Sequence, residues 1–139
     1  MPLQFIHPIQ RATHRIGLFV DKLTEQQLTQ GEAHILALLA EFSPQTVAEL
    51  HRGLAHKRST LTSILDRLEH RNLITRQTGE PDRRTFVVSL TTIGRKLAGR
   101  VNRHFLDLEK RVRRKVRPGE IEAFERVLVA VESEAGRAG

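Results

Sequence analysis

The chain has 139 residues, enough for one compact domain built around one core. It contains no cysteine, which excludes a disulfide framework, a thiolate metal site and a cysteine-based redox sensor. No apolar run approaches the ~20 residues that cross a bilayer, and the N-terminus lacks the pattern of a signal peptide. We therefore expect a soluble, cytoplasmic protein with no membrane partner.

The charge balance favours an acidic partner. The 23 Lys and Arg residues exceed the 16 Asp and Glu residues, which gives a formal net charge of +7. That excess suits duplex DNA, RNA or an anionic membrane surface. The chain has no Trp or Tyr and six Phe, so few rings are present to stack on unpaired bases. Composition thus favours double-stranded DNA.

Apolar spacing and capping patterns predict helices in the first part of the chain. Between Ile9 and Leu23 apolar residues recur every three or four positions, as on one face of an amphipathic helix. Thr29 and Thr46 each stand three residues before a glutamate, the capping-box pattern. We expect a helix from Thr29 to about Phe42 and a short one from Thr46, with a serine-proline break and a tight turn between them.

The segment 57–70 predicts a fourth helix with two unlike faces. The face expected to be buried carries Leu61, Ile64, Leu65 and Leu68. The opposite face carries Arg58, Ser59, Thr62, Ser63 and Asp66. These polar side chains have no large apolar group to bury and are free to contact a partner. Asn72 follows, where a residue that tolerates the left-handed conformation would end the helix.

A hairpin and two more helices complete the prediction. Strands are expected at 73–77 and 85–90, where Phe86, Val88 and Leu90 alternate with Thr85, Val87 and Ser89. The charged segment 79–84 connects them as a basic tip. Thr91 can cap a long helix with an apolar stripe formed by Ile93, Leu97, Val101, Phe105, Leu108, Val112 and Val116. After Pro118-Gly119 a final helix carries Ile121, Phe124, Leu128 and Val131.

The predicted fold class is mainly α with a small β-hairpin wing. It is a winged helix-turn-helix domain flanked by N- and C-terminal dimerisation helices. The first helix and the last two are amphipathic but lie outside the compact middle of the chain. A second copy of the chain is the simplest partner for their apolar stripes, so we expect a homodimer.

The chain resembles the MarR family of transcriptional regulators between Leu28 and Arg95. The resemblance rests on TVAEL (46–50), KRSTLTSILDRLEHRNLITR (57–76), PDRR (81–84) and LTTIGRKL (90–97). It implies a single MarR-like domain over 1–139, in which 28–91 bind DNA and 1–27 and 92–139 form the dimer. It also implies that the two winged lobes contact consecutive major grooves of a pseudo-palindromic operator.

The resemblance places DNA contacts on the recognition helix and on the wing. On the helix they are Lys57, Arg58, Ser59, Thr60, Thr62 and Ser63. On the wing they are Arg76, Asp82, Arg83 and Arg84. Asp82 would brace the wing and Arg84 enter the minor groove, while Arg76 and Arg83 would contact phosphate or brace the wing. Independently, a helix with short polar side chains and arginine suits a major groove about 12 Å wide.

Lys57 departs from the family pattern, in which a serine or another good N-cap is more usual. A lysine near a helix N-terminus also opposes the helix dipole. We expect a DNA phosphate to supply the missing acceptor and the counter-charge, with Lys57 in contact with it.

The basic run 110–117 has two interpretations, and the seven histidines raise the question of a metal site. The run is either a solvated face partly paired with acidic residues such as Glu120, or a secondary contact for flanking DNA or another acidic partner. The histidines show no helical ligand spacing with a third ligand nearby, so we expect no metal and no cofactor. His56 is more simply a surface group or a contact to the DNA backbone.

The sequence contains no Gly-x-Ser-x-Gly, no phosphate-binding glycine loop and no His-Glu-x-x-His, so we do not expect an enzyme. It predicts a sequence-specific regulator of transcription that binds double-stranded DNA as a homodimer. Repression of nearby genes is expected before activation. A small-molecule effector is expected to modulate binding, although no residue identifies it and a regulator without ligand remains open. The alternative is a winged-helix dimer that binds DNA without sequence preference or docks another protein.

Overall fold

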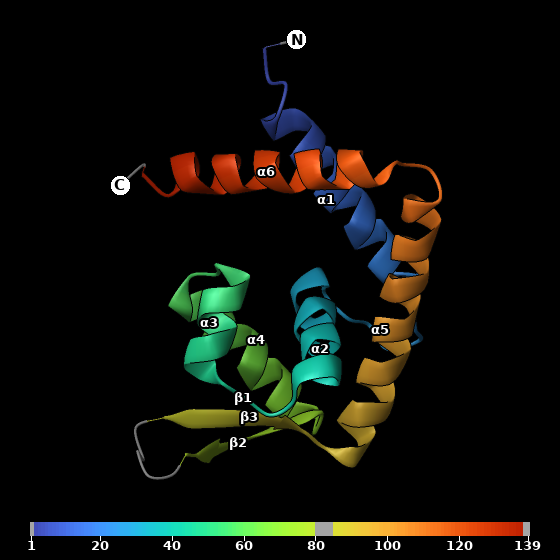
Figure 1. The fold of residues 1–139 in the computed structure, drawn as a ribbon. Coiled ribbons are helices and arrows are strands. Elements are labelled where there is room, and N and C mark those ends of the chain that lie inside the picture. The colour runs from blue at the N-terminus through green and yellow to red at the C-terminus, as the bar shows by residue number, and fades with distance from the viewer. Residues whose placement is uncertain (1, 80–84, 138–139) are drawn as a thin grey trace. The chain divides into compact units, whose positions relative to one another are not determined.

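The computed structural model describes residues 2–79 and 85–137. Along the chain lie α1 (Ile6–Val20), α2 (Gln30–Phe42), β1 (Gln45–Thr46), α3 (Val47–Leu54), α4 (Arg58–His70), β2 (Ile74–Thr78), β3 (Phe86–Leu90), α5 (Thr92–Arg113) and α6 (Pro118–Ala135) (Figure 1). The chain forms two compact units. One spans Ile16–Phe105, and the other joins the residues up to Arg15 with those from Leu106 on. The mainly α class with a winged helix-turn-helix is confirmed.

Threonine side chains set the starts of α2 and α3. Thr29 Oγ1 accepts from the backbone N–H of Glu32 at 3.1 Å, and Glu32 Oε1 accepts from the Thr29 N–H at 2.9 Å. The predicted capping box of α2 is therefore complete. Thr46 Oγ1 likewise accepts from the Glu49 N–H at 3.0 Å, but the Glu49 carboxylate accepts from the Thr46 hydroxyl. The N-cap of α3 is thus confirmed, but the capping box predicted there is not formed, because the Glu49 carboxylate bonds the Thr46 hydroxyl.

The three strands form one antiparallel sheet in the order β1-β3-β2. Ile74 pairs with Leu90 and Thr78 with Phe86, as the predicted hairpin requires. The two-residue strand β1 was not predicted, and it pairs Gln45 with Val88. In Figure 1 the strands lie beneath α2, α3 and α4, and each of these helices contacts the sheet.

The core of the unit Ile16–Phe105 is built mainly from α2, α3, α4, the sheet and the first half of α5. Its largest fully buried side chains are Ile35, Leu36, Leu39, Leu50, Leu61, Leu65, Leu68, Ile74, Val88 and Val101. The predicted buried face of α4 is therefore confirmed. Each such leucine contributes roughly 1.5–3 kcal/mol by leaving water. This packing fixes α4 by one face and leaves its polar face outward.

Several predicted details are wrong. α1 begins at Ile6, ahead of the expected Ile9, because a proline is tolerated in the first turn of a helix. α5 ends at Arg113, before Val116. Ile93 is 64% exposed, since the next residue, Gly94, is the one that packs against the turn after α4. Phe86 is exposed as well, at the outer end of its strand.

The second unit has much uncovered apolar surface. α6 contains no buried residue, and Phe124 and Val129 are 58% and 65% exposed. Phe5 and Ile6, at the start of α1, are about half exposed. Phe124 belongs to the apolar stripe that the sequence predicts for the last helix, whereas Phe5, Ile6 and Val129 lie outside the predicted stripes. Within this unit none of these four side chains is buried.

Candidate nucleic-acid interface

The outward face of α4 carries the predicted helix contacts. Lys57, Arg58, Ser59, Thr60, Thr62 and Ser63 are all exposed. Lys57 is the N-cap residue, with extended backbone at φ −63° and ψ 148°, and its side chain makes no capping hydrogen bond. The first turn of α4 contains no acidic residue. The N-terminus of α4 thus presents backbone N–H groups and positive charge together, which suits an anion.

Arg67 belongs to the same surface, although the sequence reasoning did not select it. Its Nη1 donates to Ser63 Oγ at 2.9 Å, one helical turn away. The spacing of four residues could have revealed this pair. The Ser63 hydroxyl keeps its own proton to donate, so the pair can offer both a hydroxyl and a guanidinium to a partner.

A groove lies where α3, α4 and the start of β3 meet. Its lining residues are Val47, Ala48, His51, Arg52, Arg58, Leu61, Thr62, Thr85 and Phe86, around a volume of about 420 Å³. Arg58 and Thr62 enter it from α4, and the exposed ring of Phe86 enters it from the wing. The groove joins the polar face of α4 to the base of the wing.

Arg76 connects the wing to α4. Its Nη2 donates to Asp66 Oδ1 at 2.5 Å and to Glu69 Oε1 at 2.9 Å. The hydrogen bond from Arg76 lowers the pKa of Glu69, and the same bond raises the pKa of Arg76. The guanidinium is therefore engaged by two carboxylates, an arrangement that fits bracing of the wing better than a free phosphate contact.

The tip of the wing carries the other predicted contacts, Asp82, Arg83 and Arg84, and they lie outside the described residues. At the base of the tip, the Gly79 N–H donates to the carbonyl of Thr85.

The C-terminal end of α4 is closed by a Schellman motif. The Leu73 N–H donates to the carbonyl of Leu68 at 3.0 Å, and the Asn72 N–H donates to that of Glu69 at 2.9 Å. Asn72 has a φ of 60°, so the predicted left-handed residue is confirmed. The Thr91 hydroxyl then donates to the Asn72 carbonyl at 2.7 Å. These bonds fix where α4 ends and where the wing begins.

Thr91 also caps α5, as predicted, because its Oγ1 accepts from the Gly94 N–H at 2.9 Å. One hydroxyl therefore serves both helices: it donates to the turn after α4 and accepts from the first turn of α5. The start of α5 and the end of α4 are joined by this residue.

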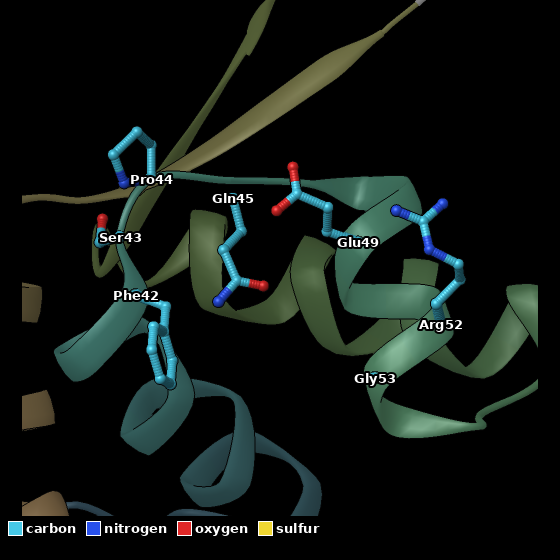
Figure 2. A pocket seen from close by; sticks show the side chains of 7 residues that line it. All are labelled: Phe42, Ser43, Pro44, Gln45, Glu49, Arg52 and Gly53. Atoms are coloured by element: carbon cyan, nitrogen blue, oxygen red, sulfur yellow. The ribbon is translucent and has the colours of Figure 1, made fainter.

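A further hollow of the unit Ile16–Phe105 lies beside α3. It is shallow, of about 710 Å³, and Figure 2 shows the seven side chains that line it, from Phe42 at the end of α2 to Gly53 in α3. Glu49 and Arg52 stand on its α3 side, and the Phe42 ring is 59% exposed. Neither a convergent set of polar groups nor a one-sided charge marks this hollow as a binding site.

The basic run 110–117 lies at the end of α5 and in the turn after it, and its basic side chains are exposed. Arg113 Nη2 donates to Glu109 Oε2 at 3.2 Å, one turn earlier. Glu120, one of the expected partners, accepts instead from the backbone N–H of Arg117 at 2.9 Å. Cations in the last turn of α5 also interact favourably with the negative C-terminal end of its dipole, which stabilises the helix.

Two further findings concern other classes of site. Across residues 2–79 and 85–137 no three His, Asp or Glu side chains come together in a group that could hold a metal ion. No helix in the same residues combines the length and apolar character needed to cross a membrane.

Comparison with known proteins agrees with this arrangement. Residues 28–86 match the sequence model of the MarR family. The HTH-type transcriptional repressor MdtR of Bacillus subtilis (strain 168) is 34% identical over 75 residues, 54% of this chain and 48% of the relative. The chain spans about half the length of the curated relatives it matches.

Solved structures extend the likeness to nearly the whole fold. The S. aureus MepR-DNA complex superposes with a TM-score of 0.79 at 23% identity, over 93% of this chain and 96% of that chain. A MarR mutant from E. coli complexed with operator DNA gives a TM-score of 0.73 at 25% identity, over 94% of each chain. These likenesses show the winged-helix fold.

Proposed function

We propose that the chain is a regulator of the MarR family, whose sequence model residues 28–86 match, and that it is a sequence-specific repressor that binds double-stranded DNA. One observation carries the proposal: the N-terminal half of α4 is exposed, polar and cationic, while its opposite face is buried in the core. A helix held in this way can enter a major groove, where side chains meet base edges.

Within α4 we assign base contacts to the first two turns, from Arg58 to Ser63. Arginine bonds the O6 and N7 atoms of guanine in pairs, and the hydroxyls of serine and threonine bond either type of base. Lys57 and the free N–H groups at the start of the helix bind a phosphate that caps the helix. This assignment explains why an uncapped lysine is tolerated at the N-cap.

We assign the wing to the adjacent minor groove and the DNA backbone. Arg84 enters the minor groove, Asp82 braces the tip and Arg83 contacts phosphate. Arg76 acts as a brace, because its bonds to Asp66 and Glu69 already hold β2 to α4. In this proposal residues 28–91 form the DNA-binding region.

We assign dimerisation to residues 1–27 and 92–139. The support is the apolar surface left uncovered on α1 and α6 in their unit, where a hollow of about 530 Å³ is lined by Phe5, Ile6, Val127, Ala130, Val131, Glu134 and Ala135. A second copy removes this surface from water at a gain of roughly 25 cal/mol per Å². A symmetric dimer then binds a pseudo-palindrome with half-sites about one helical turn apart.

Sedimentation tests the dimer with two equally exposed phenylalanines. Phe124 and Phe42 are 58% and 59% exposed, but only Phe124 lies in the proposed dimer surface. We expect Phe124→Asp to sediment as a monomer and Phe42→Asp as a dimer. A monomeric wild type, or a dimeric Phe124→Asp, would contradict the assignment.

The family resemblance adds a small-molecule effector that lowers operator affinity. Aromatic carboxylates are suitable first probes, added to the preformed protein-DNA complex. A probe that acts as the effector should release the DNA at the probe concentration that saturates the protein. A complex unaffected by every probe supports a regulator without an effector.

DNA binding is tested on the duplex upstream of the gene against a random duplex of equal length. Specific regulators bind their site at least ~10³-fold more tightly. If six to ten phosphates are neutralised, affinity also falls ~10³- to 10⁵-fold between 50 and 200 mM salt. Equal affinity for both duplexes favours a DNA-binding protein without sequence preference, and no affinity for either favours a protein-docking role.

A further inference from the structure

Arg71, the C-cap residue of α4, joins the recognition helix to the loop that precedes α2. Its Nη1 donates to the backbone carbonyl of Gln27 at 3.2 Å and its Nη2 to Gln26 Oε1 at 3.1 Å. Its Nη1 also lies 3.5 Å from Glu32 Oε2. One guanidinium therefore contacts a backbone carbonyl, an amide side chain and a carboxylate.

Glu32, which pairs with Arg71, is itself buried and held in place by the capping box of α2. The residue is 3% exposed, and among the residues that the structure describes it is the one charged residue that is buried. Its Oε1 closes the capping box of α2 with Thr29, which leaves Oε2 for Arg71. A buried carboxylate is costly unless it is paired, so Arg71 supplies the cation that Glu32 needs.

The other side of the same helix end is held by α5. The Thr91 hydroxyl bonds the carbonyl of Asn72, and the Thr91 N–H donates to the carbonyl of Leu73 at 3.1 Å. The C-terminal end of α4 is thus fastened from two directions, by Thr91 and by Arg71. The N-terminal half, which the proposed function places in the major groove, carries exposed side chains.

We propose that Arg71 is a positioning residue for operator recognition: its contacts with Glu32, Gln26 and Gln27 set the direction in which α4 points. The proposal rests on the proposed function of α4. A helix of 13 residues is about 20 Å long, so a tilt of about 5° at its C-terminus moves its N-terminus by almost 2 Å. Hydrogen bonds to base edges tolerate only a few tenths of an ångström.

This role differs from simple stabilisation in what it predicts for DNA. Phosphate contacts supply most of the affinity for a random duplex and tolerate small displacements, because they carry no sequence information. Base contacts do not tolerate such displacements. Loss of the Arg71 contacts should therefore lower affinity for the operator and spare affinity for a random duplex.

The experiment measures both affinities at one salt concentration for wild type, Arg71→Gln, Arg71→Lys and Glu32→Gln. The amide of Glu32→Gln can still accept from the Thr29 N–H, so this variant removes the charge and keeps the cap. Glu41→Gln is the control, because Glu41 is an exposed glutamate on α2, the helix that also carries Glu32. Thermal unfolding of each variant gives the folded fraction at the assay temperature.

We expect Arg71→Gln and Glu32→Gln to lower the ratio of operator to random-duplex affinity about tenfold, with an unchanged salt slope. Their double variant should lose no more than either one alone, because both remove the same contact. Arg71→Lys keeps a cation near Glu32 but not the fork of donors, and should lose less. Glu41→Gln should keep the wild-type ratio.

Two results would overturn the inference, provided that the wild type prefers its operator. One is that Arg71→Gln is folded and keeps the wild-type ratio of operator to random-duplex affinity. The other is that its affinity for both duplexes falls equally, by as much as the loss of folded protein explains. A wild type without any preference overturns the proposed function itself, before any variant is compared.

Discussion

Gly94 lies against the carbonyl of Leu73 so closely that a Cβ at residue 94 would sit 1.8 Å from the Leu73 oxygen. The first turn of α5 therefore packs directly on the backbone that leaves α4. Only a residue without a side chain permits this approach. The contact fixes the end of α4 relative to α5 within the unit Ile16–Phe105.

Gly94→Ala should lower the free energy of unfolding by about 3 kcal/mol, because the Leu73 backbone has to move to admit the methyl group. Gly99→Ala, in the same helix, is the matched control, since a Cβ there meets nothing within 4 Å. It should raise stability by about 0.5–1 kcal/mol through its better helix propensity. Urea unfolding measures both. Equal effects of the two substitutions would refute the close contact.

Ala55 ends α3 in the left-handed region, with a φ of 57°. A residue with a Cβ pays roughly 1–2 kcal/mol for that conformation, so Ala55→Gly should raise the free energy of unfolding by about 1 kcal/mol. Ala40→Gly, at an exposed position within α2, should lower it by about the same amount. If Ala55→Gly destabilises the protein as Ala40→Gly does, the left-handed assignment is wrong.

His34 makes stability depend on pH. Its pKa lies below the ordinary value of 6.5, first because the surrounding protein partly desolvates the imidazole, although the residue is exposed, and second because of the positive charge of His56. The fold therefore favours the neutral ring, and stability is full above pH 6.5 and falls as the pH drops toward the lowered pKa. His34→Gln should flatten the decline in unfolding free energy between pH 7 and about 5.5.

His104→Gln is the control for His34, because His104 is likewise an exposed histidine but lies on α5, away from the helix that carries His34. The comparison requires unfolding curves of wild type and both variants at each pH. A decline as steep in His34→Gln as in wild type would show that another group is responsible.

Arg76→Gln should lower stability by about 1 kcal/mol at neutral pH, a small figure because Glu69 is 42% exposed. The pKa of Glu69 is lowered by Arg76, so this contribution is present above the ordinary value of 4.5 and disappears as the pH falls below it. The difference from wild type should therefore shrink in acid. A difference that is constant with pH would mean that the carboxylates are not involved.

The same variant separates bracing from phosphate contact. If Arg76 is a brace, Arg76→Gln leaves the salt slope of DNA binding as in wild type, whereas loss of a phosphate contact lowers that slope by about one.

Local rules of sequence were sufficient for much of the fold. The capping residue Thr29, the buried stripe of α4 and the left-handed Asn72 each depend on neighbours within one helical turn, and each was predicted. The exposed polar face of α4 followed from the same spacing, so the helix part of the candidate site could be selected before its position in space was known.

Contacts between distant segments were not predictable in this way. The strand β1 has two residues and exists only because Val87 and Val88 pair with it. The interaction of Arg71 with Glu32 joins residues 39 positions apart in sequence, and nothing near Arg71 indicates it. Ile93 fitted the apolar stripe of α5 by spacing alone, but the close contact of Gly94 with Leu73 turns the helix so that Ile93 is exposed.

The central claim is that the first turns of α4 recognise base edges. Affinities of wild type and Arg58→Ala for the operator and for each of its single base-pair variants test this claim most directly. We expect Arg58→Ala to lose about 1–3 kcal/mol on the operator and to become indifferent to the base pair at one position in each half-site, with preferences elsewhere retained. Loss of the same factor on every duplex, or no loss at all, would contradict the claim.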